Sequence, residues 1–212
     1  NRSPDLEYVA ENELIARRLE KAENLREEGV DPYFNGFSVT HSTADVFRGF
    51  ARLDQGQLEQ DPVEVSVAGR LRFHRRMGKA SFLKIQDWST QPGSKPAGIK
   101  EDGEEVPASD DFLQIFVKSN EVGERAYGLS DALDLGDFVG VKGHLMRTKT
   151  GELTVRASEL FILTKSIRPL PDKWHGLTDI ESRFRQRYVD LAINPDASRI
   201  LRIRSKVIQL TR

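Results

Sequence analysis

The sequence of 212 residues contains no cysteine and only four histidines. Without cysteine the chain can form neither a disulfide framework nor a thiolate metal site, and the composition fits a reducing compartment such as the cytosol. His41, His74, His144 and His175 are scattered without a helical or strand pairing, so we predict no metal site. No apolar run approaches the roughly 20 residues of a membrane span, and the polar N-terminus lacks a signal-peptide core. We therefore expect a cytoplasmic protein with no membrane partner.

Motifs of common catalytic sites are also missing from the sequence. Gly78-Lys79-Ala80 is similar to the end of a phosphate-binding loop, but that motif requires Ser or Thr where Ala80 stands. No serine has the flanking residues of a nucleophile elbow. We assign no catalytic residue and no cofactor to this chain.

Charge is balanced overall but unevenly distributed. Lys and Arg number 32 against 33 Asp and Glu, so the net charge alone indicates no partner. Acidic residues dominate the segment 88–111, and basic residues dominate 165–212. Any electrostatic argument about a partner therefore depends on local clusters.

Two helices are predicted before residue 62. Residues 5–28 have the pattern of an amphipathic helix, with an apolar stripe formed by Leu6, Val9, Ile15, Leu19, Ala22 and Leu25. Ser42-Thr-Ala-Asp45 is a capping-box type of start for a shorter helix over 43–53. Residues 55–62 are polar and are expected to form a linker. Residues 1–62 are thus predicted to be an N-terminal helical extension.

From Val63 onward the hydrophobic period changes to two, which indicates β-strands. Strands are predicted over 63–73, 80–86, 112–117, 138–146 and 153–163, with a helix over 122–133 that Gly128 interrupts. A helix between the third and fourth of five short strands is the pattern of an OB-fold, a Greek-key barrel that binds oligonucleotides on its second and third strands. We predict an all-β core with flanking helices, formed by a five-stranded OB-fold barrel over 63–165.

Two segments are expected to lie outside the barrel. The segment 88–111 is long, acidic and rich in Pro and Gly, so we expect a mobile insertion between strands two and three that leaves the neighbouring face open. Residues 166–212 begin with a proline-rich hinge and continue with helices over 180–191 and 198–212, separated by Pro195. The last helix has an apolar stripe with no partner in its own segment, and the chain stops inside its pattern. We expect a fragment of a longer protein.

The stretch 69–87 combines positive charge with flat apolar surface. Its basic residues are Arg70, Arg72, Arg75, Arg76 and Lys79, and its aromatic rings are Phe73 and Phe82. Cations that neutralise phosphates, beside rings that stack on bases, are what a single-stranded nucleic-acid site requires. The stretch therefore predicts a nucleic-acid-binding surface on the first two strands.

Several motifs, in order along the chain, carry a resemblance to a known family. They are Met77-Gly-Lys-Ala-Ser-Phe82, Lys149-Thr-Gly-Glu152, Arg168-Pro-Leu-Pro-Asp-Lys173 and Arg185-Gln-Arg-Tyr188. With the barrel and its preceding helices, they resemble class II lysyl-tRNA synthetase over nearly the whole chain, the acidic insertion excepted. The resemblance implies that the barrel binds the anticodon stem-loop of tRNA-Lys. A separate catalytic domain would use ATP and Mg²⁺ to activate L-lysine and attach it to this tRNA.

The resemblance has consequences for the C-terminal part of the chain. Residues 166–212 would be the hinge and the start of the class II catalytic domain, and the helix over 199–212 would open motif 1, at the interface of a homodimer. The ATP-binding motifs 2 and 3 are absent from the sequence. The full-length protein would be a lysine–tRNA ligase of cytoplasmic protein biosynthesis, whereas the 212-residue chain alone would not aminoacylate.

The resemblance also implies roles for individual residues. Phe82 would stack on a base, and Arg75, Gln114 and Glu152 would hydrogen-bond base edges. Gln114 offers both a donor and an acceptor, and the carboxylate of Glu152 can accept the N3–H of uracil, which cytosine lacks. From the pattern alone, Phe82 could equally lie in the core and Glu152 could be a solvated hairpin residue. The remaining basic residues would line the phosphate backbone or stay solvated; they are Arg70, Arg72, Arg76 and Lys79.

Three functional hypotheses follow. The first is tRNA anticodon recognition as the N-terminal part of a lysyl-tRNA synthetase. The alternative is a freestanding OB-fold protein that binds single-stranded nucleic acid without ligase activity, and a third is a barrel face used for protein contacts. Gln114 and Glu152 favour the first, because they serve base reading rather than backbone affinity. The basic, aromatic second strand argues against the third.

Overall fold

The computed structural model describes residues 4–90, 95–100, 102–108, 110–170 and 179–212, with side chains from residue 12 onward. The chain divides into two compact units, Asn1–Pro169 and Leu170–Arg212. The end of the predicted hinge and His175 lie outside the described residues. The domain boundaries after residues 62 and 165 stay predictions.

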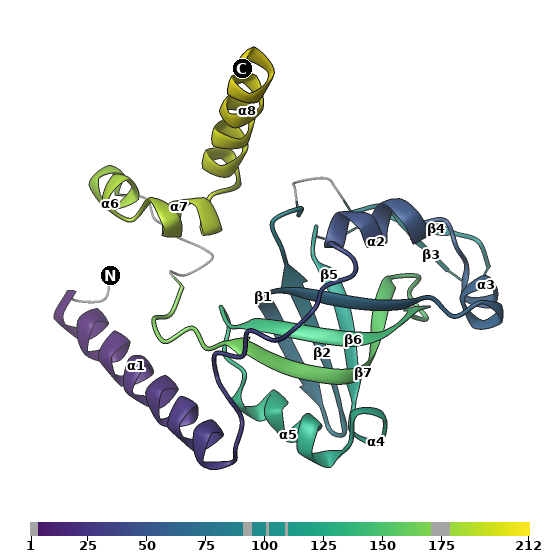
Figure 1. Cartoon of the computed structure of the whole chain (residues 1–212), viewed down its shortest axis with the longest axis horizontal. Coiled ribbons are helices and arrows are strands. Elements are labelled where there is room, and N and C mark those ends of the chain that lie inside the picture. Colours follow the sequence, from purple (N-terminus) through teal and green to yellow (C-terminus); the bar gives the residue numbers. More distant parts are fainter. Residues whose placement is uncertain (1–3, 91–94, 101, 109, 171–178) are drawn as a thin grey trace. The chain divides into compact units, whose positions relative to one another are not determined.

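The first unit is built around a closed β-barrel (Figure 1). Its strands are β1 (Glu64–Met77), β2 (Ala80–Gln86), β5 (Leu113–Lys118), β6 (Phe138–Arg147) and β7 (Leu153–Thr164). They pair in the order β1-β2-β5-β7-β6, and β6 returns to β1 to close the barrel. All neighbours are antiparallel except β5 and β7, which run parallel. This arrangement confirms the predicted OB-type barrel with flanking helices.

The inside of the barrel is filled by alternate residues of the strands, as the period of two requires. Leu71, Leu83, Ile85, Ile115 and Val141 are each fully buried. Burying one such side chain stabilises the fold by about 1.5–3 kcal/mol. The barrel interior is therefore a packed core, and its outer face is the surface available to a ligand.

Two short helices precede the barrel. The helix α2 (Thr43–Phe50) begins with the predicted capping box, in which the Ser42 and Asp45 side chains each accept a backbone N–H of the other residue. The helix α3 (Gln55–Gln60) replaces the predicted linker, so that prediction is wrong. Asp54 and Gln57 form a second capping box there, a signal that the sequence contains.

The long N-terminal helix α1 (Pro4–Glu27) confirms the predicted helix but not all of its buried stripe. Ala22 and Leu25 are buried, whereas Leu19 is 48% exposed. One turn before Ala22, Arg18 is buried instead, and its guanidinium donates to the carbonyl oxygens of Ser166 at 2.6 Å and Leu135 at 3.2 Å. The helix is thus attached to the barrel unit by polar contacts as well as apolar ones.

Two further helices lie between β5 and β6. They are α4 (Ser119–Val122) and α5 (Glu124–Ala132). The break falls at Gly123, which has a φ of 84°, and not at the predicted Gly128, which lies inside α5. A positive φ is readily adopted by glycine alone, so Gly123 ends one helix and starts the next.

The described part of the segment 88–111 contains the two-stranded ribbon β3 (Gly98–Ile99) and β4 (Glu105–Val106). Its start is fixed to α2, because Asp87 accepts the N–H of Thr43 at 2.7 Å and Ser89 accepts that of Ala44 at 2.9 Å. Ile99 donates its N–H to the carbonyl of Gly151 at 2.9 Å. The described residues thus lie against the turn between β6 and β7 rather than free of the barrel, and the expected mobility stays a prediction.

The second unit contains α6 (Ile180–Arg185), α7 (Arg187–Ile193) and α8 (Pro195–Thr211). The helix predicted over 180–191 is split at Gln186, and Pro195 begins α8 rather than breaking the chain between helices. The carboxylate of Asp190 is fully buried against Arg183 and Arg187. In the described residues, no helix is long and apolar enough to cross a membrane.

Candidate nucleic-acid interface

Side chains from four strands form a row across the outer face of the barrel. The register pairs Arg75 with Phe82, Phe82 with Phe116, and Phe116 with Arg156. Ser81 and Leu83, on either side of Phe82, are fully buried in the barrel, so Phe82 points outward. The sequence pattern left open whether Phe82 lies in the core or on the outer face, and the structure places it on the outer face.

The rings of Phe82 and Phe116 form the centre of this row. Their centroids are 5.0 Å apart and their planes are inclined by 41°. Both side chains are partly exposed. Two adjacent aromatic rings on an open face give a surface on which unpaired bases can stack.

The two ends of the row differ in their partners. Arg75 is exposed on β1. Arg156 on β7 is held by Glu121, with its Nε and Nη2 donating to the two carboxylate oxygens at 2.7 Å each. Hydrogen bonds from Arg156 outweigh burial and lower the pKa of Glu121 below its ordinary value of 4.5. Arg75 is therefore the arginine of the row that is open to a ligand.

The next row along the strands contains Gln114. It lies opposite Lys84 of β2 and Thr154 of β7. Gln114 is 7% exposed, and its Nε2 donates to the Thr154 hydroxyl at 3.0 Å. This bond fixes the orientation of the amide, so its carbonyl oxygen is the group that remains for a base donor.

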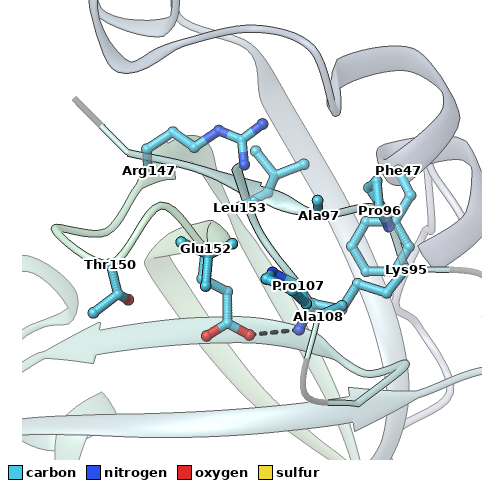
Figure 2. A pocket seen from close by; sticks show the side chains of 12 residues that line it. Phe47, Lys95, Pro96, Ala97, Pro107, Ala108, Arg147, Thr150, Glu152 and Leu153 are labelled. Atoms are coloured by element: carbon cyan, nitrogen blue, oxygen red, sulfur yellow. Dashed lines mark hydrogen bonds and ion pairs between the residues drawn. The ribbon is translucent and has the colours of Figure 1, made fainter. Parts of the chain in front are cut away.

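Glu152 lies at the end of the β6–β7 turn in a cluster of four charges with Lys84, Lys95 and Asp110. Figure 2 shows its contact with Lys95. Its Oε1 accepts a hydrogen bond from Lys95 at 2.5 Å and lies 3.5 Å from the Nζ of Lys84. Its side chain is 21% exposed, so Glu152 is not the solvated hairpin residue of the alternative interpretation. We call these four residues the charge cluster.

The charge cluster stabilises the ionised forms of Lys84 and Asp110. Burial disfavours the charge of Lys84, but the bond to Asp110 and the charge of Glu152 outweigh it and raise its pKa above 10.5. Burial likewise opposes ionisation of Asp110, and the bond from Lys84 outweighs it and lowers the Asp110 pKa below 3.8. Both groups therefore remain charged at neutral pH.

A pocket of about 220 Å³ lies between α2, the segment 88–111 and the β6–β7 turn (Figure 2). Of the four residues predicted to contact bases, Glu152 lines it. The Arg147 guanidinium also lines it, but donates to the carbonyl oxygens of Ala51, Leu53 and Gly151. Its wall is otherwise mostly apolar, so the pocket offers few polar groups to a ligand.

The remaining basic residues of the stretch 69–87 have different surroundings. Arg70 donates to the Gly136 carbonyl at 3.1 Å and lies over the ring of Phe138. Arg76 pairs with Asp131, Arg72 lies 5.7 Å from the ring centroid of Phe112, and Lys79 is exposed in the β1–β2 turn. Arg70 and Arg76 thus have structural partners within the protein, while phosphate contact by these four residues stays a prediction.

The structure adds residues that the sequence interpretation did not include. Phe116 could have been found, because the period of two places it on the same face as Gln114. Lys84 shares the outward face of β2 with Phe82 for the same reason. Lys95 could not have been found, since no periodicity connects residue 95 to a turn near residue 152.

The closed barrel and its outer aromatic row place the chain in the OB-fold class, whose members bind oligonucleotides and oligosaccharides on this face. Within this class the chain is similar to the lysine–tRNA ligases, as the motifs in its sequence predicted. No protein-family model matches it.

Three relatives show the extent of this similarity. The lysine–tRNA ligase of Burkholderia ambifaria (strain MC40-6) is 46% identical over 93% of this chain. Those of Shouchella clausii (strain KSM-K16) and Anaeromyxobacter sp. (strain K) are 42% and 41% identical over 95% and 94% of it. The chain spans only 35–36% of the length of these relatives. The resemblance is therefore confirmed over the chain, which corresponds to about a third of such a ligase.

Proposed function

We propose that this chain recognises the anticodon of tRNA-Lys as the N-terminal part of a lysine–tRNA ligase. The observation that carries the proposal is the outer row in which the tilted rings of Phe82 and Phe116 pack together beside Arg75, with Gln114 and Glu152 in the adjoining positions. Bases of an anticodon loop are unstacked and accessible, which is what such a surface requires. The similarity to lysine–tRNA ligases supports this function over a freestanding single-strand binder.

Each proposed contact has a distinct task. A base stacks on Phe82, and the guanidinium of Arg75 holds a base edge or a phosphate. The carbonyl oxygen of Gln114 and the carboxylate of Glu152 accept hydrogen bonds from base N–H groups, which selects uracil over cytosine at N3. The two acceptors therefore give specificity, while the aromatic rings and the basic groups give affinity.

The proposal extends to the whole ligase. The full-length enzyme activates L-lysine with ATP and Mg²⁺ in a domain that begins in residues 166–212, and works in the cytoplasm as a homodimer. Residues 1–62 are the helical extension and 63–165 the anticodon-binding domain. This chain supplies recognition of the tRNA and none of the chemistry of aminoacylation.

Replacement of Phe82 tests the proposal. We expect the wild-type chain to bind an RNA hairpin with a UUU loop triplet more tightly than hairpins with unrelated triplets. Phe82→Ala should remove about 1–3 kcal/mol of this binding, the contribution of one stacked base. Fluorescence anisotropy at constant salt measures both effects, because phosphate contacts depend on salt.

Phe184→Ala is the matched control, since Phe184 is an aromatic residue of α6 that is 70% exposed and lies outside the row. It should leave the affinity unchanged. Equal affinity of the wild-type chain for all hairpins at moderate salt would contradict the proposal.

A further inference from the structure

The described residues of the segment 88–111, here called the insertion, contact the barrel through two facing glycines. A Cβ atom on Gly98 would lie 2.8 Å from the carbonyl oxygen of Gly151, and one on Gly151 would lie 2.6 Å from the carbonyl carbon of Ile99. The backbones can therefore approach closely enough for the bond from Ile99 to Gly151. This contact places the insertion directly beside Glu152.

The insertion contributes two of the four residues of the charge cluster. Lys95 bonds to Oε1 of Glu152 at 2.5 Å, and Asp110 bonds to Lys84 at 2.5 Å. Lys95 and Asp110 also contact each other at 3.3 Å. The side chain of Lys95 is only 5% exposed, so its ammonium group is enclosed by the cluster rather than spread over the surface.

These distances indicate that the insertion changes the ion-pair partners of Lys84 and Glu152. The barrel alone would pair Lys84 with Glu152, whose charged atoms lie 3.5 Å apart. With the insertion in place, Asp110 takes the closer position on Lys84 and Lys95 takes the closer position on Glu152. Because the insertion adds one positive and one negative charge to the charge cluster, the cluster stays neutral beside a polyanionic ligand.

We infer that the insertion is part of the base-reading site, and that Lys95 and Asp110 are specificity-determining residues that orient Glu152. The inference rests on the proposed function, since its ligand is the uracil-containing anticodon loop. In the described part of the chain, Oε2 of Glu152 has no hydrogen-bond partner. Lys95 holds Oε1, so Oε2 is the acceptor for a uracil N3–H.

Charge-changing variants of the two insertion residues test this role in the 212-residue chain. The readout is the discrimination ratio: the dissociation constant for hairpins in which each uracil in turn is replaced by cytosine, divided by that for a UUU hairpin. In Lys95→Met the carboxylates of Asp110 and Glu152 share Lys84, so Glu152 is no longer held in one orientation. The ratio should therefore fall about tenfold, which corresponds to the loss of one charge-assisted hydrogen bond. Overall affinity should fall as well, because the site gains a net negative charge.

Asp110→Asn should have the opposite effect on affinity. Both lysines are then left to Glu152, so all hairpins bind more tightly while the discrimination ratio falls. The double variant Lys95→Met/Asp110→Asn leaves Lys84 to pair directly with Glu152, so its ratio should rise above that of either single variant but stay below that of the wild type, a non-additive result expected of residues in one network. Lys95→Arg keeps the charge and should retain the ratio.

Lys100→Met and Asp102→Asn are the matched controls, because they change the same residue types in the insertion outside the charge cluster. Thermal melting followed by circular dichroism shows whether a variant is folded, so that a change in discrimination can be attributed to the RNA-binding site. If Lys95→Met does not fold, Asp110→Asn and Lys95→Arg test the inference in its place. Ratios in the cluster variants equal to those of the controls would overturn the inference, while Phe82→Ala would still report on the proposed function. A wild-type chain that does not discriminate would overturn the proposed function itself.

Discussion

At the scale of single residues, the first unit contains buried charges as well as an apolar core. The ammonium group of Lys165 is fully buried and donates to Asp134, Asp137 and the carbonyl of Ala132, each at 2.6 Å. Asp137 is itself fully buried and accepts the N–H of Ser166 at 2.7 Å. These bonds fix the end of β7 to the loop that follows α5.

Replacement of Lys165 is expected to destabilise the fold strongly. Lys165→Met leaves the buried carboxylate of Asp137 without its cation, and removal of one partner of a buried pair costs about 3–5 kcal/mol. Urea denaturation measures the loss in the free energy of unfolding.

The control for this prediction is Lys142→Met. Lys142 pairs with Glu159 on the surface, where both side chains are about half exposed. An exposed pair contributes about 0–1 kcal/mol, so this variant should differ little from the wild type. Equal losses in the two variants would contradict the importance of the buried pair.

At the scale of elements, the sequence predicts those parts of the fold that follow a local period. The strands and the capped α2 are of this kind. The buried Arg18 contradicts a stripe drawn from hydropathy, since hydropathy assigns arginine to the surface. The outward direction of Phe82 needed the neighbouring strands, because Phe82 and Leu83 are both apolar and adjacent.

The position of the insertion depends on a contact that has no sequence pattern. Two glycines far apart in the chain must face each other, and turn-rich composition predicts only that the segment is a loop. The part of the site formed by Arg75, Phe82, Gln114 and Glu152 could be named from the family resemblance. The part formed by Lys95 could not, because the resemblance excludes the insertion.

Gly98→Ala tests the contact between the insertion and the turn. Gly98 does not have a positive φ, so the added methyl group acts only through its collision with the Gly151 backbone. The insertion should detach without a change in barrel stability, and limited proteolysis should cleave it faster. The ability of Gly98→Ala to discriminate between RNA hairpins should resemble that of the double variant Lys95→Met/Asp110→Asn.

Gly49→Ala is the matched control for this variant. A Cβ atom at Gly49, in α2, meets no atom within 4 Å. The substitution should therefore leave proteolysis and RNA binding unchanged. Unchanged proteolysis of Gly98→Ala would show that the glycine contact does not hold the insertion in place.

At the scale of the whole molecule, paired carboxylates make stability depend on pH in the acid range. Burial opposes ionisation of Asp134, but bonds from Lys165 and Lys21 outweigh it and lower its pKa below 3.8. A carboxyl group with a lowered folded-state pKa stabilises the fold above its unfolded-state value. That contribution is lost as the pH falls through the lower, folded-state value.

The free energy of unfolding should therefore vary little, through Asp134, between neutral pH and about pH 5, and fall below pH 3.8. Urea denaturation over a series of pH values measures this dependence. Asp134→Asn should make the acid part of the curve less steep, whereas the same change at the exposed Asp61 should not. A wild-type curve that is flat in acid would contradict the prediction.

The order of the strands has a consequence for synthesis of the chain on the ribosome. Lys95 and Asp110 are translated before the turn that contains Gly151 and before β7, which closes the barrel by pairing with β5 and β6. At about 5–20 residues per second, the insertion exists for seconds before its docking partner. During that time Lys84 and Asp110 can already pair, whereas Glu152, the partner of Lys95, has not yet been synthesised. The proposed base-reading site is thus complete only after β7, the last strand of the barrel, has been made.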